Sequence, residues 1–198
     1  MSNRKGETDR MPITALKEWA VSVDALLEGK QIVVMRKGGI AEETRDFRLI
    51  TNGFCLLPAY EHQKAHLLKP EYAGMLERTL REWSPEQERI RIRGYAEAVQ
   101  DIEVTDRETL DKLRDLHIWT DEFAEERLKW KRKNPLHVLL LRVYRLEEEL
   151  SVPNNPAYTG CKSWVQLEDG PQLPSMKPVL TDAEFDAAVQ NVKTALSR

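Results

Sequence analysis

Residues 136–146 read LHVLLLRVYRL and carry the strongest strand pattern in this chain of 198 residues. A continuous leucine- and valine-rich run that follows an Asn-Pro pair is typical of a strand buried on both faces. We therefore expect this segment to occupy a central position in a sheet, and the other predicted elements are arranged around it.

Other segments have the composition or the alternation of strands, which the turn residues around them support. One of them, Arg89–Val99, alternates apolar and basic residues up to Gly94, which predicts one solvated face and a bulge at the glycine. The further predicted strands are Gln31–Arg36, Thr44–Ile50, Phe54–Leu57 and Cys161–Leu167.

Helices are predicted before, between and after these strands. The apolar spacing from Pro12 to Leu27 predicts an amphipathic helix that ends at Gly29. Residues 61–88 are rich in Glu, Lys, Arg and Leu and predict a helical insertion between two strands. Three further helices are predicted. Thr105 with Glu108 and Thr181 with Glu184 form capping boxes that begin two of them, and the third follows Thr120.

The order of these elements predicts an α+β fold, because few connections are long enough for βαβ crossovers. Residues 1–11 are polar and charged and are expected to form a flexible leader. A single α+β domain is expected over residues 12–170, and residues 171–198 are expected to form a linker and a C-terminal amphipathic helix.

Composition restricts the classes of function. The chain has 30 Lys and Arg against 33 Asp and Glu, a formal net charge of -3 that argues against non-specific coating of nucleic acid but allows a local basic face. No apolar run approaches the roughly 20 residues of a membrane helix, and the N-terminus lacks the apolar region of a signal peptide. The only two cysteines, Cys55 and Cys161, lie far apart. A cytoplasmic protein without a membrane partner is expected.

A glycine turn at Lys37-Gly38-Gly39 precedes the first candidate binding motif. Glu43 and Arg45 are two residues apart on a predicted strand and therefore share one face. A carboxylate beside a guanidinium can hold a planar polar ligand. The alternative interpretation is a charged hairpin rim.

The second motif follows a short apolar strand and contains Tyr60, Glu61, His62 and Gln63. Glu61 beside His62 could tune a general base, or the segment could be a polar junction at the start of a helix. His66 lies four residues after His62, but Gln63 stands where the zinc-protease pattern needs glutamate. We therefore expect no metal site.

Two further motifs combine aromatic and polar residues. His117 and Trp119 could stack on a base, or Trp119 could belong to the core. Lys162 and Ser163 precede Trp164 and could offer a cation and a hydroxyl, or they could lie on an edge strand. The chain has no Walker loop, Rossmann glycine pattern or nucleophile elbow, so no cofactor is expected.

Several stretches together resemble an uncharacterised prokaryotic family, domain of unknown function 1802. They are ALKEWA at 15–20, RKGGI at 36–40, PAYEHQ at 58–63, HIWT at 117–120 and GCKSWV at 160–165. The similarity extends over nearly everything from Ala15 to Leu167. It implies no activity.

A second, weaker resemblance is to the ASCH branch of the PUA-like fold, in which a glycine turn carries the pattern G-x-K-x-x-E-x-R. Gly38, Glu43 and Arg45 match it, whereas Ile40 occupies the lysine position and Lys37 lies one residue before the glycine. This resemblance implies a small mixed β-barrel, with the helical insertion and terminal helices added, that binds RNA or modified nucleosides.

These observations favour an RNA- or nucleotide-binding module. Lys37 and Arg45 would contact a phosphate or carbonyl, Tyr60 would stack, Gln63 would contribute a hydrogen bond, and Glu43 or Glu61 would read an exocyclic amine.

Two alternatives remain open, and the oligomeric state is left undetermined. The first is a metal-independent hydrolase of a nucleoside or phosphodiester, with Glu43 or Glu61 as the base and His62 as the proton donor. The second is a protein-interaction module that presents the helical insertion 61–88 and the C-terminal helix to a partner.

Overall fold

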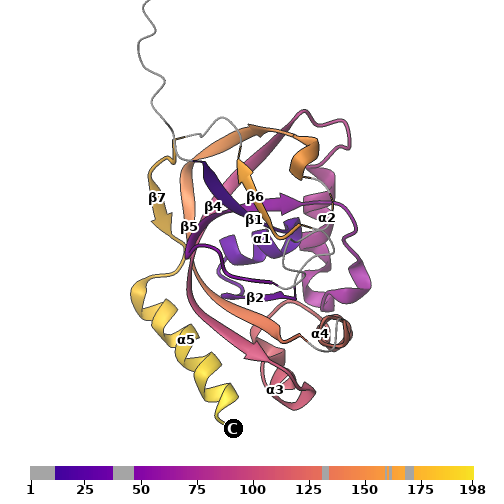
Figure 1. Cartoon of the computed structure of the whole chain (residues 1–198), viewed down its shortest axis with the longest axis vertical. Coiled ribbons are helices and arrows are strands. Elements are labelled where there is room, and N and C mark those ends of the chain that lie inside the picture. The colour runs from indigo at the N-terminus through magenta and orange to yellow at the C-terminus, as the bar shows by residue number, and fades with distance from the viewer. Residues whose placement is uncertain (1–11, 38–46, 131–133, 159, 161, 168–171) are drawn as a thin grey trace, which may run out of the picture.

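The computed structural model describes residues 12–37, 47–130, 134–158, 160, 162–167 and 172–198 (Figure 1). Its described strands form one mixed sheet in the order β2-β5-β4-β3-β1-β6, with β7 paired to β5 beside β2. The strands are β1 (Ile13–Trp19), β2 (Val33–Arg36), β3 (Gly53–Ala59), β4 (Arg89–Val104), β5 (Leu136–Pro153), β6 (Trp164–Leu167) and β7 (Met176–Pro178).

The strand predicted over residues 136–146 is confirmed and is longer than predicted. β5 continues to Pro153 and has neighbours on both edges, with β4 antiparallel along most of its length. The register of the β4–β5 pair shifts between Ile92 and Gly94, which confirms the bulge. A Cβ at Gly94 would lie 2.9 Å from Leu27 Cδ2, so the glycine allows α1 (Ala20–Leu27) to pack closely against the sheet.

The helix predicted from Pro12 to Leu27 is correct only in its second half. Residues 13–19 form β1, which pairs in parallel with β3 and antiparallel with β6. Ala15 and Leu16 are fully buried, and all eight residues of α1 are buried as well. The apolar residues of this short segment match a helical period by chance, and its pairing with distant strands decides its conformation.

The helices connect and cover the sheet (Figure 1). Residues 61–88 contain α2 (Ala73–Arg81) after two short 3₁₀ turns, and α3 (Arg107–Asp111) and α4 (Asp121–Lys129) connect β4 to β5. Asp106, not Thr105, caps α3, whereas Thr120 caps α4 as predicted. The predicted capping box of Thr181 and Glu184 opens α5 (Asp182–Leu196).

Other sequence predictions differ from the structure. Phe47–Ile50 are not in a strand, and residues 44–46 of that prediction lie outside the described residues, as does the leader 1–11. The predicted linker contains β7, which pairs with Tyr144–Leu146 of β5. Among the described helices, none has the length and apolar character needed to cross a bilayer.

The α+β class is confirmed, but the predicted closed barrel is wrong. In the described part of the chain, β2 and β6 stand at opposite ends of the strand order and do not pair. The fully buried α1 contributes Val21 to one core cluster and Leu26 to another, so a helix fills space inside the curved sheet. At the gap between the two sheet edges, side chains rather than backbone hydrogen bonds connect Arg36 of β2 to Ser163, which precedes β6.

Candidate functional site

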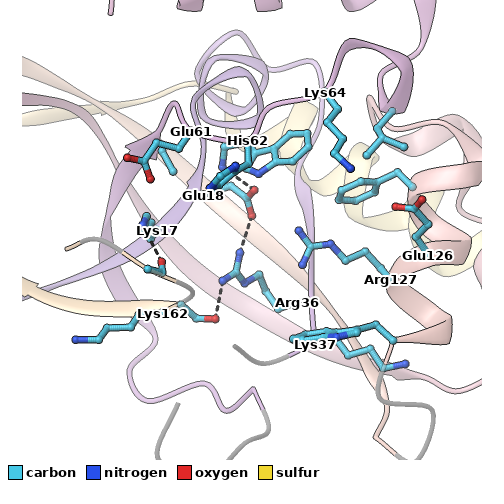
Figure 2. A pocket seen from close by; sticks show the side chains of 17 residues that line it. Lys17, Glu18, Arg36, Lys37, Glu61, His62, Lys64, Glu126, Arg127 and Lys162 are labelled. Carbon is cyan, nitrogen blue, oxygen red and sulfur yellow. Dashed lines mark hydrogen bonds and ion pairs between the residues drawn. The ribbon is translucent and has the colours of Figure 1, made fainter. Parts of the chain in front are cut away.

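A pocket of about 670 Å³ lies at this gap between the sheet edges (Figure 2). Four parts of the fold form it: the end of β1, the end of β2, the segment after β3, and α4. The residues just before β6 complete its wall. Its volume falls within the range of sites that hold small ligands.

The floor of the pocket is a buried ion pair. Arg36 donates from Nη1 to Glu18 Oε2 at 3.2 Å and from Nη2 to Ser163 Oγ at 2.6 Å. The side chains of Arg36 and Glu18 are only 11% and 7% exposed. Because β1 and β6 pair up to Leu16 and Trp164, and the Lys17 N–H donates to the Ser163 carbonyl at 2.8 Å, Glu18 and Ser163 are held beside each other. We call Glu18, Arg36 and Ser163 the floor cluster.

Backbone contacts fix the floor cluster further. Glu18 Oε1 accepts the Trp19 N–H at 2.8 Å, directly before α1, where a negative charge is favoured by the helix N-terminus. The buried Nε of Arg36 has no hydrogen-bond partner among the described residues. The two Nη atoms, through their bonds to Glu18 and Ser163, fix the orientation of the guanidinium.

The lining of the pocket is more positive than the rest of the protein. Six Lys and Arg side chains line it against three Glu, although the whole chain has a net charge of -3. The cations are Lys17, Arg36, Lys37, Lys64, Arg127 and Lys162, and the acids are Glu18, Glu61 and Glu126. A concave surface with this excess attracts anions.

Aromatic side chains line the same pocket. Trp19, Phe123 and Trp130 contribute to its wall. Phe123 is stacked on the buried Trp119 at a ring separation of 4.1 Å, and the guanidinium carbon of Arg127 lies 5.0 Å from the centre of the Phe123 ring. This cation–π contact orients Arg127 toward the pocket.

Of the residues singled out in the sequence, Lys37, Glu61, His62, Lys162 and Ser163 line the pocket. Lys37 is only 2% exposed, and its ammonium donates to the Leu128 carbonyl at the end of α4. Burial lowers the pKa of Lys37 below the ordinary lysine value. Its amine therefore holds α4 against β2, which differs from the predicted contact with a phosphate.

Glu61 and His62 lie at the rim of the pocket, and both are exposed (Figure 2). His62 has φ 62° and is the only non-glycine residue with a positive φ in the described part of the chain. Left-handed backbone is unfavourable for a residue with a side chain, so the surrounding contacts must hold this turn.

Tyr60 and Gln63 hold the turn rather than line the pocket. Gln63 Oε1 accepts the Val21 N–H of α1 at 3.0 Å, and its Nε2 donates to the Tyr60 carbonyl at 3.3 Å. Tyr60 is stacked on Trp83 at a ring separation of 5.8 Å, and burial raises its pKa. Their predicted ligand contacts are replaced by contacts within the protein, because α1 and the segment before β4 pack against this turn.

His117 and Trp119 belong to the core, so the structure favours the core alternative over stacking on a base. They are 3% and 2% exposed, and His117 Nδ1 accepts the Trp119 N–H at 3.2 Å. Burial, and then the positive charge of Lys69, lowers the pKa of His117 to about 4. Neither ring reaches the pocket.

The remaining site candidates, Glu43 and Arg45, lie outside the described residues. In the part of the chain that the structure describes, no cluster of three or more His, Cys, Asp or Glu could hold a metal ion. Cys55 is buried, and burial raises its pKa to about 12, so the thiol is not a nucleophile at neutral pH.

Sequence reasoning missed Glu18, Arg36, Lys64 and Arg127. Arg36 ends a predicted strand, and polar groups at strand ends are candidates for binding, so its position is a usable signal. Glu18 gives no such signal because the pattern of its segment predicts a helix. Lys64 and Arg127 lie in segments where charged residues are frequent, and their sequence context does not distinguish them.

Comparison with known proteins gives one family and a set of solved structures. The chain is similar to the crystal structure of ASCH from Zymomonas mobilis, at 12% identity and a TM-score of 0.40, over 89% of this chain and 93% of that one. It is also similar to the crystal structure of a serine-to-alanine mutant of the same protein. The identity is 12% and the TM-score 0.41, over 89% of this chain and 94% of that one. No curated protein matches.

The family model described as "Domain of unknown function (DUF1802)" matches residues 15–191, which include most of β1, every other described strand and most of α5. The match extends over the floor cluster and the whole wall of the pocket. The chain belongs to the DUF1802 family.

Proposed function

We propose that this protein binds RNA, or a nucleotide, in the pocket between the two sheet edges. The observation that carries the proposal is the combination of excess positive charge and aromatic side chains in one pocket of about 670 Å³, in a chain whose net charge is negative. Phosphate groups are recognised by Lys and Arg, and unpaired bases stack on aromatic rings. A pocket of this shape favours an unstacked nucleotide over a double helix.

The floor cluster supplies the polar contacts that such a ligand needs. Arg36 is oriented by Glu18 and Ser163, so little conformational entropy is lost when a ligand accepts a hydrogen bond from it. Trp19 and Trp130 supply apolar ring surface in the same wall. The RNA class also agrees with what the sequence resemblance to the ASCH branch implies.

Fluorescence anisotropy with a labelled single-stranded RNA hexamer tests the proposal. We expect binding that weakens between about 50 mM and about 200 mM salt with a shallow slope, because few phosphates are neutralised. Removing Arg36 alone would leave Glu18 buried and unpaired, so the informative variant changes both, Glu18→Gln with Arg36→Met. This double variant should bind RNA at least tenfold more weakly, a loss of about 1.4 kcal/mol or more.

Arg81→Met is the matched control, since Arg81 is exposed on α2 and does not line the pocket. Its RNA affinity should equal that of the unaltered protein. RNA affinity that is absent, independent of salt, or unchanged in the double variant contradicts the proposal.

A second candidate function, hydrolysis of a nucleoside or phosphodiester, draws on one observation. His62 is held at the rim in a left-handed conformation beside Glu61, and strained backbone is frequent at catalytic sites. Product formation from RNA that requires both Glu61 and His62 would support hydrolysis. Equal product formation by Glu61→Gln, His62→Ala and the unaltered protein would remove it.

The protein-interaction hypothesis required exposed apolar faces on the insertion 61–88 and on α5, and much of that surface is buried. The apolar residues of α5 pack against a core cluster of the same chain, with Val192 only 1% exposed. In the insertion, Met75 and Leu76 of α2 are likewise buried. Most of these apolar residues are covered within the protein, and Leu80 of α2 stays 43% exposed.

A further inference from the structure

Three of the six cations in the pocket face its centre. Arg36 comes from the end of β2, Lys64 from the segment after β3, and Arg127 from α4. Figure 2 shows the two guanidinium groups pointing toward the same space, with the Lys64 side chain directed to it from the opposite wall. We call Arg36, Lys64 and Arg127 the central cations.

The other three cations bind backbone carbonyls. Lys17 Nζ donates to the Gly160 carbonyl at 3.0 Å, and the Lys37 ammonium donates to the Leu128 carbonyl. Lys162 extends away from the centre of the pocket in Figure 2, with Nζ 3.5 Å from the Ala157 carbonyl. Three of the six lining cations therefore face the centre, and one of them, Arg36, is paired with Glu18.

The central cations are held in different ways that suit one polyvalent anion. Glu18 and Ser163 fix Arg36, and the Phe123 ring orients Arg127. Lys64 is exposed, and its ammonium makes no hydrogen bond or ion pair within the described residues, so it can adjust to a ligand. Two oriented guanidinium forks and one adaptable ammonium provide donors around a single point.

We propose that the pocket selects a nucleoside 5′-phosphomonoester, with the central cations as its ligands, over a phosphodiester inside a strand. A phosphomonoester has three terminal oxygens and a charge of roughly -1.5 to -2 at pH 7, whereas each phosphodiester in a strand carries a single negative charge. Three donor groups from three parts of the fold match the monoester better. This inference rests on the proposed function and specifies the chemical group that the site recognises.

The phosphomonoester could belong to a free nucleotide or to the 5′ end of an RNA strand. Trp19 and Trp130 line the same pocket as the central cations and offer ring surface to the attached base in both cases.

The experiment compares 3′-labelled hexauridylate with and without a 5′-phosphate, and 5′-UMP and uridine as competitors. The 5′-phosphate should raise the affinity of the hexamer about tenfold or more, because charge-assisted hydrogen bonds are the stronger class. 5′-UMP should displace the hexamer at a concentration at least about tenfold lower than uridine. If the hexamer then binds much more tightly than 5′-UMP, the ligand is an RNA end, and equal affinities identify the nucleotide itself.

Lys64→Ala is the decisive variant, because Lys64 is exposed and its loss leaves the fold intact. It should reduce the preference for the 5′-phosphate about fivefold or more and change the affinity for the 5′-hydroxyl hexamer less than about twofold. Arg127→Gln should act in the same direction. Lys30→Ala, at an exposed position outside the pocket, is the control and should retain the full preference.

Two results would overturn the inference. Equal affinity of the unaltered protein for both hexamers would show that the phosphomonoester is not selected, while RNA binding through the pocket would stand. A preference that is undiminished in Lys64→Ala and Arg127→Gln would place the phosphate away from the central cations. Absence of binding to every probe would overturn the proposed function as well.

Discussion

The chain contains two short segments in which a histidine lies near aromatic residues, and the fold uses them in opposite ways. In residues 60–63, His62 is exposed at the rim of the pocket. In residues 117–119, His117 and Trp119 are almost completely buried. Each segment has an aromatic residue two positions from a histidine, and the two segments differ in what covers them.

Backbone pairing explains the difference. Residues 67–69 bond to the second segment: the Lys69 N–H donates to the Ile118 carbonyl at 3.0 Å, and the Thr120 N–H donates to the Leu67 carbonyl at 2.9 Å. The insertion after β3 therefore covers His117 and Trp119. The first segment is held from beneath by Gln63 and the start of α1, and its outer side stays open to solvent. A histidine beside an aromatic residue indicates a site only when no other segment pairs over it.

The largest effect expected from this comparison is on stability. Trp119→Ala should lower the free energy of unfolding by about 3–5 kcal/mol, because it removes the ring that packs against both Trp19 and Phe123. Urea denaturation followed by far-UV circular dichroism measures the change. His62→Ala at the rim should change stability by less than about 1 kcal/mol. A similar loss of stability in both variants would show that residues 117–119 are not in the core while residues 60–63 are at the rim.

The next effect is the pH dependence of stability that the buried His117 causes. The pKa of His117 is lowered to about 4 in the folded protein, chiefly by burial, from about 6.5 in the unfolded chain. The unfolded state therefore binds the proton more readily, and the stability that the neutral ring contributes is present above about pH 6.5 and is lost as the pH falls toward 4. Between about pH 7 and about pH 4.5 the loss from this residue should be about 2 kcal/mol.

His117→Asn provides the comparison, since the amide oxygen can still accept the Trp119 N–H and the side chain does not titrate. The difference in unfolding free energy between this variant and the unaltered protein should become smaller by about 2 kcal/mol as the pH falls. A constant difference for His117→Asn across this range would mean that the buried imidazole accepts a proton without disturbing the fold.

Features that depend on local pattern can be predicted from the sequence, and features that depend on distant segments cannot. The strand over residues 136–146, the bulge at Gly94 and the cap at Thr181 depend on local pattern, and the structure confirms them. The local pattern of β1 predicts a helix and is wrong, because the conformation of β1 depends on β3 and β6, which are far from it in sequence. The extra length of β5 is likewise a property of its pairing with β4.

In the pocket too, the part formed by one segment can be predicted from the sequence and the part formed by several cannot. Its rim at Glu61 and His62 is visible in the sequence as polar residues that follow an apolar strand. Its floor joins Glu18, Arg36 and Ser163 from three parts of the chain, and no local pattern connects them. The open sheet creates this floor, because a closed barrel would place backbone hydrogen bonds where the Arg36 side chain now spans the gap.

The smallest predicted effect tests whether the rim is held by its surroundings. At φ 62°, a side chain at position 62 carries a backbone cost of about 1–2 kcal/mol that glycine avoids. We expect His62→Gly to be more stable than His62→Ala by about 1 kcal/mol in urea denaturation. Position 65, in a right-handed 3₁₀ turn three residues later, supplies the opposite control, where Ala65→Gly should destabilise by about 0.5–1 kcal/mol. If alanine proved the more stable residue at position 62, the turn would relax once the imidazole is removed, and the rim would be shaped by His62 itself rather than by Gln63 and α1.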